Sequence, residues 1–79
     1  MLAKVYITLK KGVHDPQGQA VEDTLSKLGY EGVKGVRIGK FVEMELGSDD
    51  VEGNKKRVEE MCQKLLANSV IETYKVELS

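Results

Sequence analysis

Apolar and polar side chains alternate along the first part of the chain, from residue 3 to residue 11. One side carries Ala3, Val5, Ile7 and Leu9, and the other carries Lys4, Tyr6, Thr8 and Lys10. Successive side chains of a strand point to opposite faces of a sheet, so this period of two predicts a strand with one buried face.

A helical period follows over residues 16–28. Asp15 is a good N-cap because its carboxylate accepts a hydrogen bond from an amide one turn on, and Pro16 fits the first helical position, which needs no N–H. Gly29 suits a left-handed C-terminal cap. The apolar residues recur at spacings that place them on one helix face: Ala20, Val21, Leu25 and Leu28. The sequence therefore predicts an amphipathic helix with defined ends.

Residues 35–47 have two interpretations that both keep the apolar residues Val36, Ile38, Val42, Met44 and Leu46 on one face. One is a long strand that bends at Gly39. The other is a hairpin whose loop is Gly39-Lys40-Phe41. Gly-Lys is a poor hairpin turn, which favours the long bent strand. Such a strand would extend beyond the core of a small domain, so its end would need another chain to pair with.

Turn and capping residues at positions 47–50 precede a second helical pattern. Its apolar stripe consists of Val51, Val58, Met61, Cys62, Leu65 and Leu66. The place of Cys62 on this stripe indicates a buried structural thiol rather than a reactive one. The pattern ends at Asn68-Ser69. Alternation from Val70 to Leu78 then predicts a final strand, with Val70, Tyr74, Val76 and Leu78 on one side.

These elements predict an α+β fold with two helices packed on one face of a small, mostly antiparallel sheet. The order is strand, helix, strand (long, and bent or split), helix, strand. The helices resemble each other, since Val21-Glu22-Asp23 corresponds to Val58-Glu59-Glu60 at 37 residues further on. We therefore expect two related halves, as in ferredoxin-like domains, within a single domain of residues 1–79.

The composition of the chain limits the kinds of partner that we expect. A chain of 79 residues buries a small core, and its one cysteine cannot form an internal disulfide, so we expect a homo-oligomer, either dimer or tetramer. The lone cysteine and the absence of a targeting signal or an apolar span favour a cytoplasmic protein with no membrane partner. A formal net charge of -1 argues against nucleic acid as a partner.

The sequence contains no arrangement of nucleophile, base and metal ligands that predicts catalysis, so we expect no catalytic, metal-binding or cofactor-binding residue. His14 lacks a motif partner and is interpreted as an ordinary loop residue. One polar cluster has two interpretations. Arg37 and Lys40 flank Gly39 and either present two cations to a carboxylate or phosphate, or belong to a solvated strand.

Four stretches together resemble the PurS family, the small subunit of bacterial and archaeal phosphoribosylformylglycinamidine synthase. They are residues 4–10, Asp15-Pro16-Gln17-Gly18-Gln19-Ala20-Val21, Leu28-Gly29-Tyr30 and Val36-Arg37-Ile38-Gly39-Lys40. The similarity covers nearly the whole chain. The resemblance implies a role in de novo purine synthesis, in an enzyme that uses glutamine and ATP to convert formylglycinamide ribonucleotide into formylglycinamidine ribonucleotide.

The resemblance further implies a non-catalytic assembly subunit, which joins a glutaminase subunit to a large synthetase subunit so that ammonia passes between them. ATP and Mg would then be used by the synthetase partner, and this subunit would bind no cofactor. We expect contacts with partner subunits or a neighbouring protomer at Asp15, Pro16, Gln17, Gly18, Arg37, Gly39, Lys40, Tyr6 and Phe41. The alternative is a regulatory small-molecule-binding domain of the ACT type, which has comparable size and element order.

Overall fold

The computed structural model describes residues 1–79. Its elements follow the order β1 (Leu2–Leu9), α1 (Pro16–Lys27), β2 (Lys40–Glu45), α2 (Val51–Met61), η1 (Cys62–Leu66) and β3 (Glu72–Leu78), where η1 is a π-helical turn that continues α2. This arrangement confirms the α+β class and the order of strands and helices. Neither helix combines the length and the apolar character needed to cross a bilayer.

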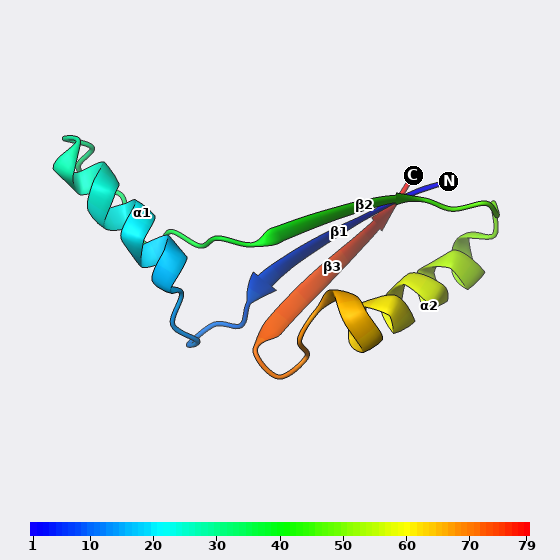
Figure 1. The fold of residues 1–79 in the computed structure, drawn as a ribbon. Helices are drawn as coiled ribbons and strands as arrows, with labels where there is room; N and C mark the ends of the chain where they lie inside the picture. The colour runs from blue at the N-terminus through cyan, green and yellow to red at the C-terminus, as the bar shows by residue number, and fades with distance from the viewer.

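The three strands form one antiparallel sheet in the order β2-β1-β3 (Figure 1). The central residue Val5 lies opposite Val42 on one neighbour and opposite Val76 on the other. Ala3, Val5 and Ile7 are buried, as the alternation predicted. The sheet is therefore organised around β1, which has a hydrogen-bonded partner along both edges.

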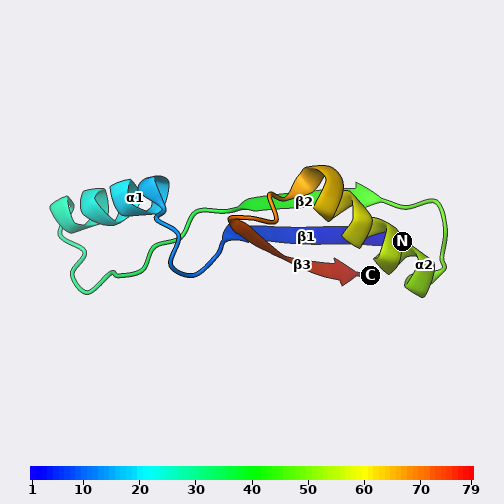
Figure 2. The same cartoon turned by 90° about the horizontal axis from the view of Figure 1, so that it is seen from below.

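α2 lies against one face of the sheet (Figure 2). Val58 on this helix and Cys62 at the start of η1 are fully buried and pack with the buried residues of β1. In η1, the Ala67 N–H donates to the Cys62 carbonyl at 2.9 Å, five residues back. This wider turn changes the helical register, so Leu65 points outward with 83% exposure, contrary to the predicted stripe. Val51, in the first turn, is also exposed rather than buried.

The hairpin interpretation of residues 35–47 is wrong. Residues 40–45 form β2 and pair along their length with β1, so Ile38 and Val42 are not cross-strand partners. Residues 33–39 join α1 to β2 without strand pairing. Only the second half of the predicted long strand therefore belongs to the sheet of this chain.

α1 extends beyond the end of the sheet, together with the segments on either side of it (Figures 1 and 2). We call residues 11–39 the arm. The molecule is consequently elongated, with principal extents of 48 × 24 × 15 Å. Gly18 is the only buried residue of α1. The expected covering of the sheet by helices is thus made within this chain by α2, while the apolar side of α1 remains open.

Candidate interaction site at the base of the arm

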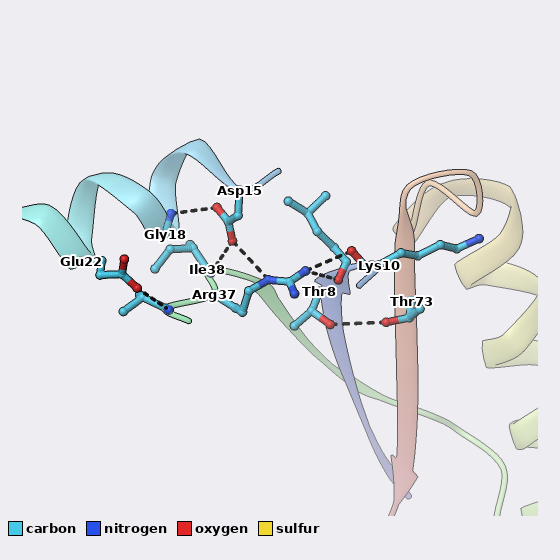
Figure 3. A network of polar contacts seen from close by, with 10 residues as sticks. Thr8, Lys10, Asp15, Gly18, Glu22, Arg37, Ile38 and Thr73 are labelled. Carbon is cyan, nitrogen blue, oxygen red and sulfur yellow. Dashed lines mark hydrogen bonds and ion pairs between the residues drawn. The ribbon is translucent and has the colours of Figure 1, made fainter. Parts of the chain in front are cut away.

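Asp15 occupies the N-cap of α1, as the sequence predicted, and also contacts the segment that returns from α1 to the sheet. Its Oδ1 accepts a hydrogen bond from Gly18 N–H at 2.8 Å, and its Oδ2 accepts one from Ile38 N–H at 2.8 Å (Figure 3). Its side chain is only 8% exposed. The carboxylate therefore links the beginning of the arm to its end.

The hydrogen bonds from Gly18 and then Ile38 lower the pKa of Asp15 below its ordinary value, and the positive charge of Arg37 acts in the same direction. Asp15 is therefore held as a carboxylate. A group with a lowered pKa that already accepts two backbone hydrogen bonds is poorly suited to act as a general base.

Arg37 extends from the returning segment toward the end of β1. Its Nε lies 3.8 Å from Asp15 Oδ2, and its terminal nitrogen donates hydrogen bonds to the carbonyls of Leu9 and Lys10 (Figure 3). The guanidinium therefore joins three parts of the chain: the end of β1, the N-cap of α1 and the returning segment. We call these contacts the Asp15–Arg37 network.

Close backbone packing accompanies this network. A Cβ atom built on Gly18 would overlap the Val36 carbonyl oxygen, and one built on Gly39 would overlap the Ile7 carbonyl oxygen. Glu22 on α1 accepts a further hydrogen bond from Val36 N–H at 3.4 Å. Gly18 and Gly39 are thus required because two backbone segments approach each other closely.

Lys40 begins β2 and forms an ion pair with Glu72 of β3 at 3.5 Å. Glu72 was not singled out from the sequence, although its side chain is only 13% exposed and its other oxygen accepts a hydrogen bond from Asn68 N–H. Strand pairing brings Glu72 opposite Leu9, beside the base of the arm. Sequence alone gave no signal for this pair because the register between β1 and β3 was unknown.

The expected interface residues at the base of the arm, except the buried Gly18, line two shallow hollows. One, of about 460 Å³, includes His14, Asp15 and Arg37, and the other, of about 220 Å³, includes Pro16, Gln17, Gly39 and Lys40. The lining of the larger hollow is mainly polar, whereas that of the smaller one is more apolar. Across the described chain there is no group of three or more His, Cys, Asp or Glu side chains placed to hold a metal ion.

Tyr6 and Phe41 form a second cluster on the sheet face opposite α2. They are cross-strand partners, with ring centroids 5.1 Å apart, and 39% and 54% of their respective surfaces are exposed. The Tyr6 hydroxyl donates to Glu77 at 3.2 Å, and partial burial together with this carboxylate raises the pKa of Tyr6. Register places Ile7 opposite Lys40, so the aromatic pair adjoins the base of the arm.

Sequence comparison finds similarity over nearly the whole chain. The family model described as "PurS: Phosphoribosylformylglycinamidine (FGAM) synthase" matches residues 2–79. The phosphoribosylformylglycinamidine synthase subunit PurS of Bacillus subtilis is 48% identical over 75 residues, covering 95% of this chain and 88% of that protein. The Synechocystis subunit of the same name is 45% identical over 76 residues, covering 96% and 76% respectively.

Solved structures show the same fold. Bacillus subtilis PurS aligns with a TM-score of 0.86 and 47% identity, covering 96% of this chain and 94% of that one. A chain in the structure of PurLQS from Thermotoga maritima aligns with a TM-score of 0.83 and 32% identity, covering 98% and 96%. The elongated shape, with α1 projecting from the sheet, therefore occurs in a chain similar to subunits of known assemblies.

Proposed function

Because the chain belongs to the PurS family of phosphoribosylformylglycinamidine synthase subunits, we propose that it is the non-catalytic assembly subunit of that complex in purine biosynthesis. In this role it bridges the glutaminase and synthetase subunits, so that ammonia is transferred to formylglycinamide ribonucleotide. The main support is the alignment of 98% of this chain with a chain of the PurLQS structure.

This proposal assigns the chemistry to the partners. ATP and Mg would bind to the synthetase subunit, and this subunit would use no cofactor. The isolated chain should therefore show no glutaminase or ATPase activity, because it contributes no nucleophile–base pair or phosphate-binding loop. Turnover by the repurified chain alone would contradict the proposal. A single buried free cysteine, Cys62, is in keeping with a cytoplasmic complex.

We further propose that the chain assembles as a homo-oligomer, a dimer or tetramer, in which a second copy covers the arm. Two features support a second copy. Leu28 is 68% exposed and Val21 is 39% exposed on the apolar side of α1, and residues 33–39 have no strand partner within the chain. The apolar helix face and the unpaired segment lie at the same end of the molecule. One sheet from a second copy would therefore both cover the apolar face of α1 and provide a strand partner for residues 33–39.

The expected interface divides into two parts under this proposal. Tyr6, Phe41, Gln17 and Lys40 expose side-chain surface for a neighbouring protomer or a partner subunit. Asp15, Gly18, Arg37 and Gly39 have contacts inside the chain, and Pro16 begins α1. Arg37→Ala with Lys40→Ala should keep the sheet folded and weaken assembly, whereas Lys55→Ala on the exposed side of α2 should not.

Reconstitution provides the test. The large synthetase and glutaminase subunits from the same source are mixed with and without this chain, and formation of formylglycinamidine ribonucleotide is measured with glutamine or ammonia as nitrogen donor. Addition of the chain should restore glutamine-dependent synthesis and co-purification of all three proteins. Unchanged glutamine-dependent synthesis without the chain would refute the assembly role. An ACT-type domain would instead bind an amino acid or nucleotide by itself.

A further inference from the structure

The arm meets the rest of the chain at a narrow base, where two segments cross. One leaves β1 through Lys10 and the other returns through residues 36–39 to β2. The residues of α1 are exposed except for the buried Gly18 and the half-buried Glu22 and Leu25. Because no other buried side chain of α1 holds it against the sheet, the direction of the arm depends on the contacts at this base.

The Asp15–Arg37 network connects every segment that crosses the base (Figure 3). Asp15 accepts hydrogen bonds from α1 and from the returning segment, both at 2.8 Å. Arg37 connects the returning segment to the carbonyls at the end of β1. Both oxygens of Asp15 are occupied and its side chain is 8% exposed, so little of this group remains to contact another protein.

We propose that Asp15 and Arg37 are positioning residues, which fix the direction of the arm within the single chain before any second copy binds. The proposal rests on the self-association proposed above, because a fixed arm has an effect on function only if a second copy binds to it. A chain whose arm already points in the assembled direction binds a second copy more tightly than a chain whose arm samples many directions. The apparent dissociation constant rises in inverse proportion to the fraction of competent chains.

The size of the effect follows from this relation. If loss of the network leaves one chain in ten with its arm in the competent direction, each copy contributes a factor of about 10 to the apparent dissociation constant. A dimer in which both arms are used would then be weakened by about 100-fold. A residue that merely added one exposed contact would change the constant by much less and would leave the free arm unchanged.

Asp15→Ser is the informative variant, because serine remains a good N-cap for Gly18 N–H but is too short to reach Ile38 N–H as well. This variant therefore separates the effect of capping α1 from the effect of fixing the direction of the arm. Asp23→Ser is the matched control: Asp23 is an exposed carboxylate on α1 whose side chain contacts only Gln19 of the same helix. Both variants should retain the helix content of the native chain by circular dichroism.

Single-molecule fluorescence energy transfer reports directly how widely the direction of the arm varies. Dyes are attached at Ser26→Cys on α1 and Lys56→Cys on α2, both exposed positions, while the fully buried Cys62 does not react. The measurement is made at picomolar concentration, and only particles with one donor and one acceptor dye are counted, so that single chains are observed. The native chain and Asp23→Ser should give one narrow transfer distribution, and Asp15→Ser and Arg37→Ala should each give a broad one. Because both residues belong to one network, the double variant should broaden the distribution by less than the sum.

Sedimentation of the unlabelled proteins supplies the second measurement, in which Asp15→Ser should raise the dissociation constant by about 10-fold or more relative to Asp23→Ser. Equal transfer widths for Asp15→Ser and Asp23→Ser would overturn the proposal, whatever the sedimentation result. If the native chain does not self-associate, the proposed oligomer fails, and the transfer widths still decide whether Asp15 and Arg37 fix the arm.

Discussion

The two helices have similar sequence patterns and lie in opposite surroundings. Each carries an apolar stripe, and Val21 on α1 corresponds to Val58 on α2 at 37 residues further on. Val58 is fully buried against the sheet, whereas Val21 is 39% exposed on the projecting arm. An apolar stripe thus shows that a helix face is to be covered, but it does not show whether the covering surface belongs to the same chain.

The difference between the helices comes from the segments that connect them. Seven residues without strand pairing, 33–39, precede β2 in the connection from α1, and the Asp15–Arg37 network ties this segment to the N-cap of α1 and to the end of β1. α2 is followed at once by η1 and a short turn, which leads back into β3 beside β1. Connection geometry, rather than amphipathicity, therefore determines which helix packs within the chain.

Substitution of the two corresponding valines gives the largest expected difference. Val58→Asp places an unpaired charge in the core and should cost more than about 3 kcal/mol, enough to unfold a domain this small. Val21→Asp should leave the sheet and α2 folded and remove self-association, because the charge lies on the open face of α1. Thermal unfolding by circular dichroism and sedimentation velocity measure the two effects.

This comparison fails if Val21→Asp unfolds the chain at every concentration, because α1 would then be necessary for folding as well as assembly. It also fails if Val21→Asp self-associates like the native chain. Leu65→Asp is a control for the introduced charge: Leu65 is an exposed apolar residue of η1, outside the arm, and should tolerate aspartate with little loss of stability.

The second prediction concerns Asn54, the one buried polar residue of α2. Its Nδ2 donates to the Ser48 carbonyl at 2.7 Å and contacts Met1 Sδ at 3.4 Å, so it ties the start of α2 to the loop before it. Asn54→Ala removes this hydrogen bond and the packing of a fully buried side chain, and should cost about 2 kcal/mol in urea unfolding.

Gln19→Ala on α1 is the counterpart for Asn54→Ala. Gln19 also makes one side-chain hydrogen bond, to Asp23 at 2.9 Å, but both groups are exposed. Its loss should change the free energy of unfolding by less than about 0.5 kcal/mol. Equal costs for the two substitutions would show that the difference in burial between the helices has no energetic consequence.

The two helices also differ in how closely other parts of the chain pack against a glycine within each of them. Alanine favours a helix over glycine by about 1 kcal/mol, so Gly53→Ala should stabilise α2 by up to that amount, since the added Cβ meets only the end of the flexible Asp50 side chain. Gly18→Ala should instead destabilise by about 1–2 kcal/mol, because the Cβ overlaps the Val36 backbone. Unfolding midpoints in urea check both signs, and stabilisation by Gly18→Ala would contradict the close packing.

Much of the local structure could be predicted from the sequence because short-range chemistry determines it. The N-cap at Asp15 is confirmed by its bond to Gly18, and the left-handed Gly29 ends α1 with the bond from Tyr30 N–H to the Leu25 carbonyl that such caps make. The alternation around Val5 correctly predicted the buried face of β1. Each of these depends on residues within one turn or one strand.

The remainder depends on contacts between distant parts of the chain. The second bond of Asp15 is to Ile38, and Lys40 finds Glu72 across the sheet; neither partner could be identified without the register and the crossing at the base of the arm. The exposure of Leu65 results from a single wide turn in η1 that periodicity does not reveal. The family resemblance predicted the function, since no catalytic motif was available to do so.

The smallest expected effect is that of low pH, which should act differently on the N-terminal caps of the two helices. The Asp15 carboxylate accepts hydrogen bonds at the N-cap of α1, whereas Asp50 at the N-cap of α2 makes no side-chain capping bond. The pKa of Asp15 is lowered in the folded chain, so its contribution to stability is complete above the pKa of an unfolded aspartate. That contribution is lost as pH falls through the lower, folded pKa.

Below about pH 4 the base of the arm should therefore loosen progressively as Asp15 takes up a proton. Amide signals of Gly18 and Ile38, followed by nuclear magnetic resonance, should shift together with the Asp15 carboxyl and share its midpoint, which should lie below that of an aspartate in an unstructured peptide. In Asp15→Asn, these amides should show no transition with that midpoint. A midpoint at or above the peptide value would mean that the two backbone hydrogen bonds do not stabilise the carboxylate, and the arm would then owe its direction to contacts other than those of Asp15.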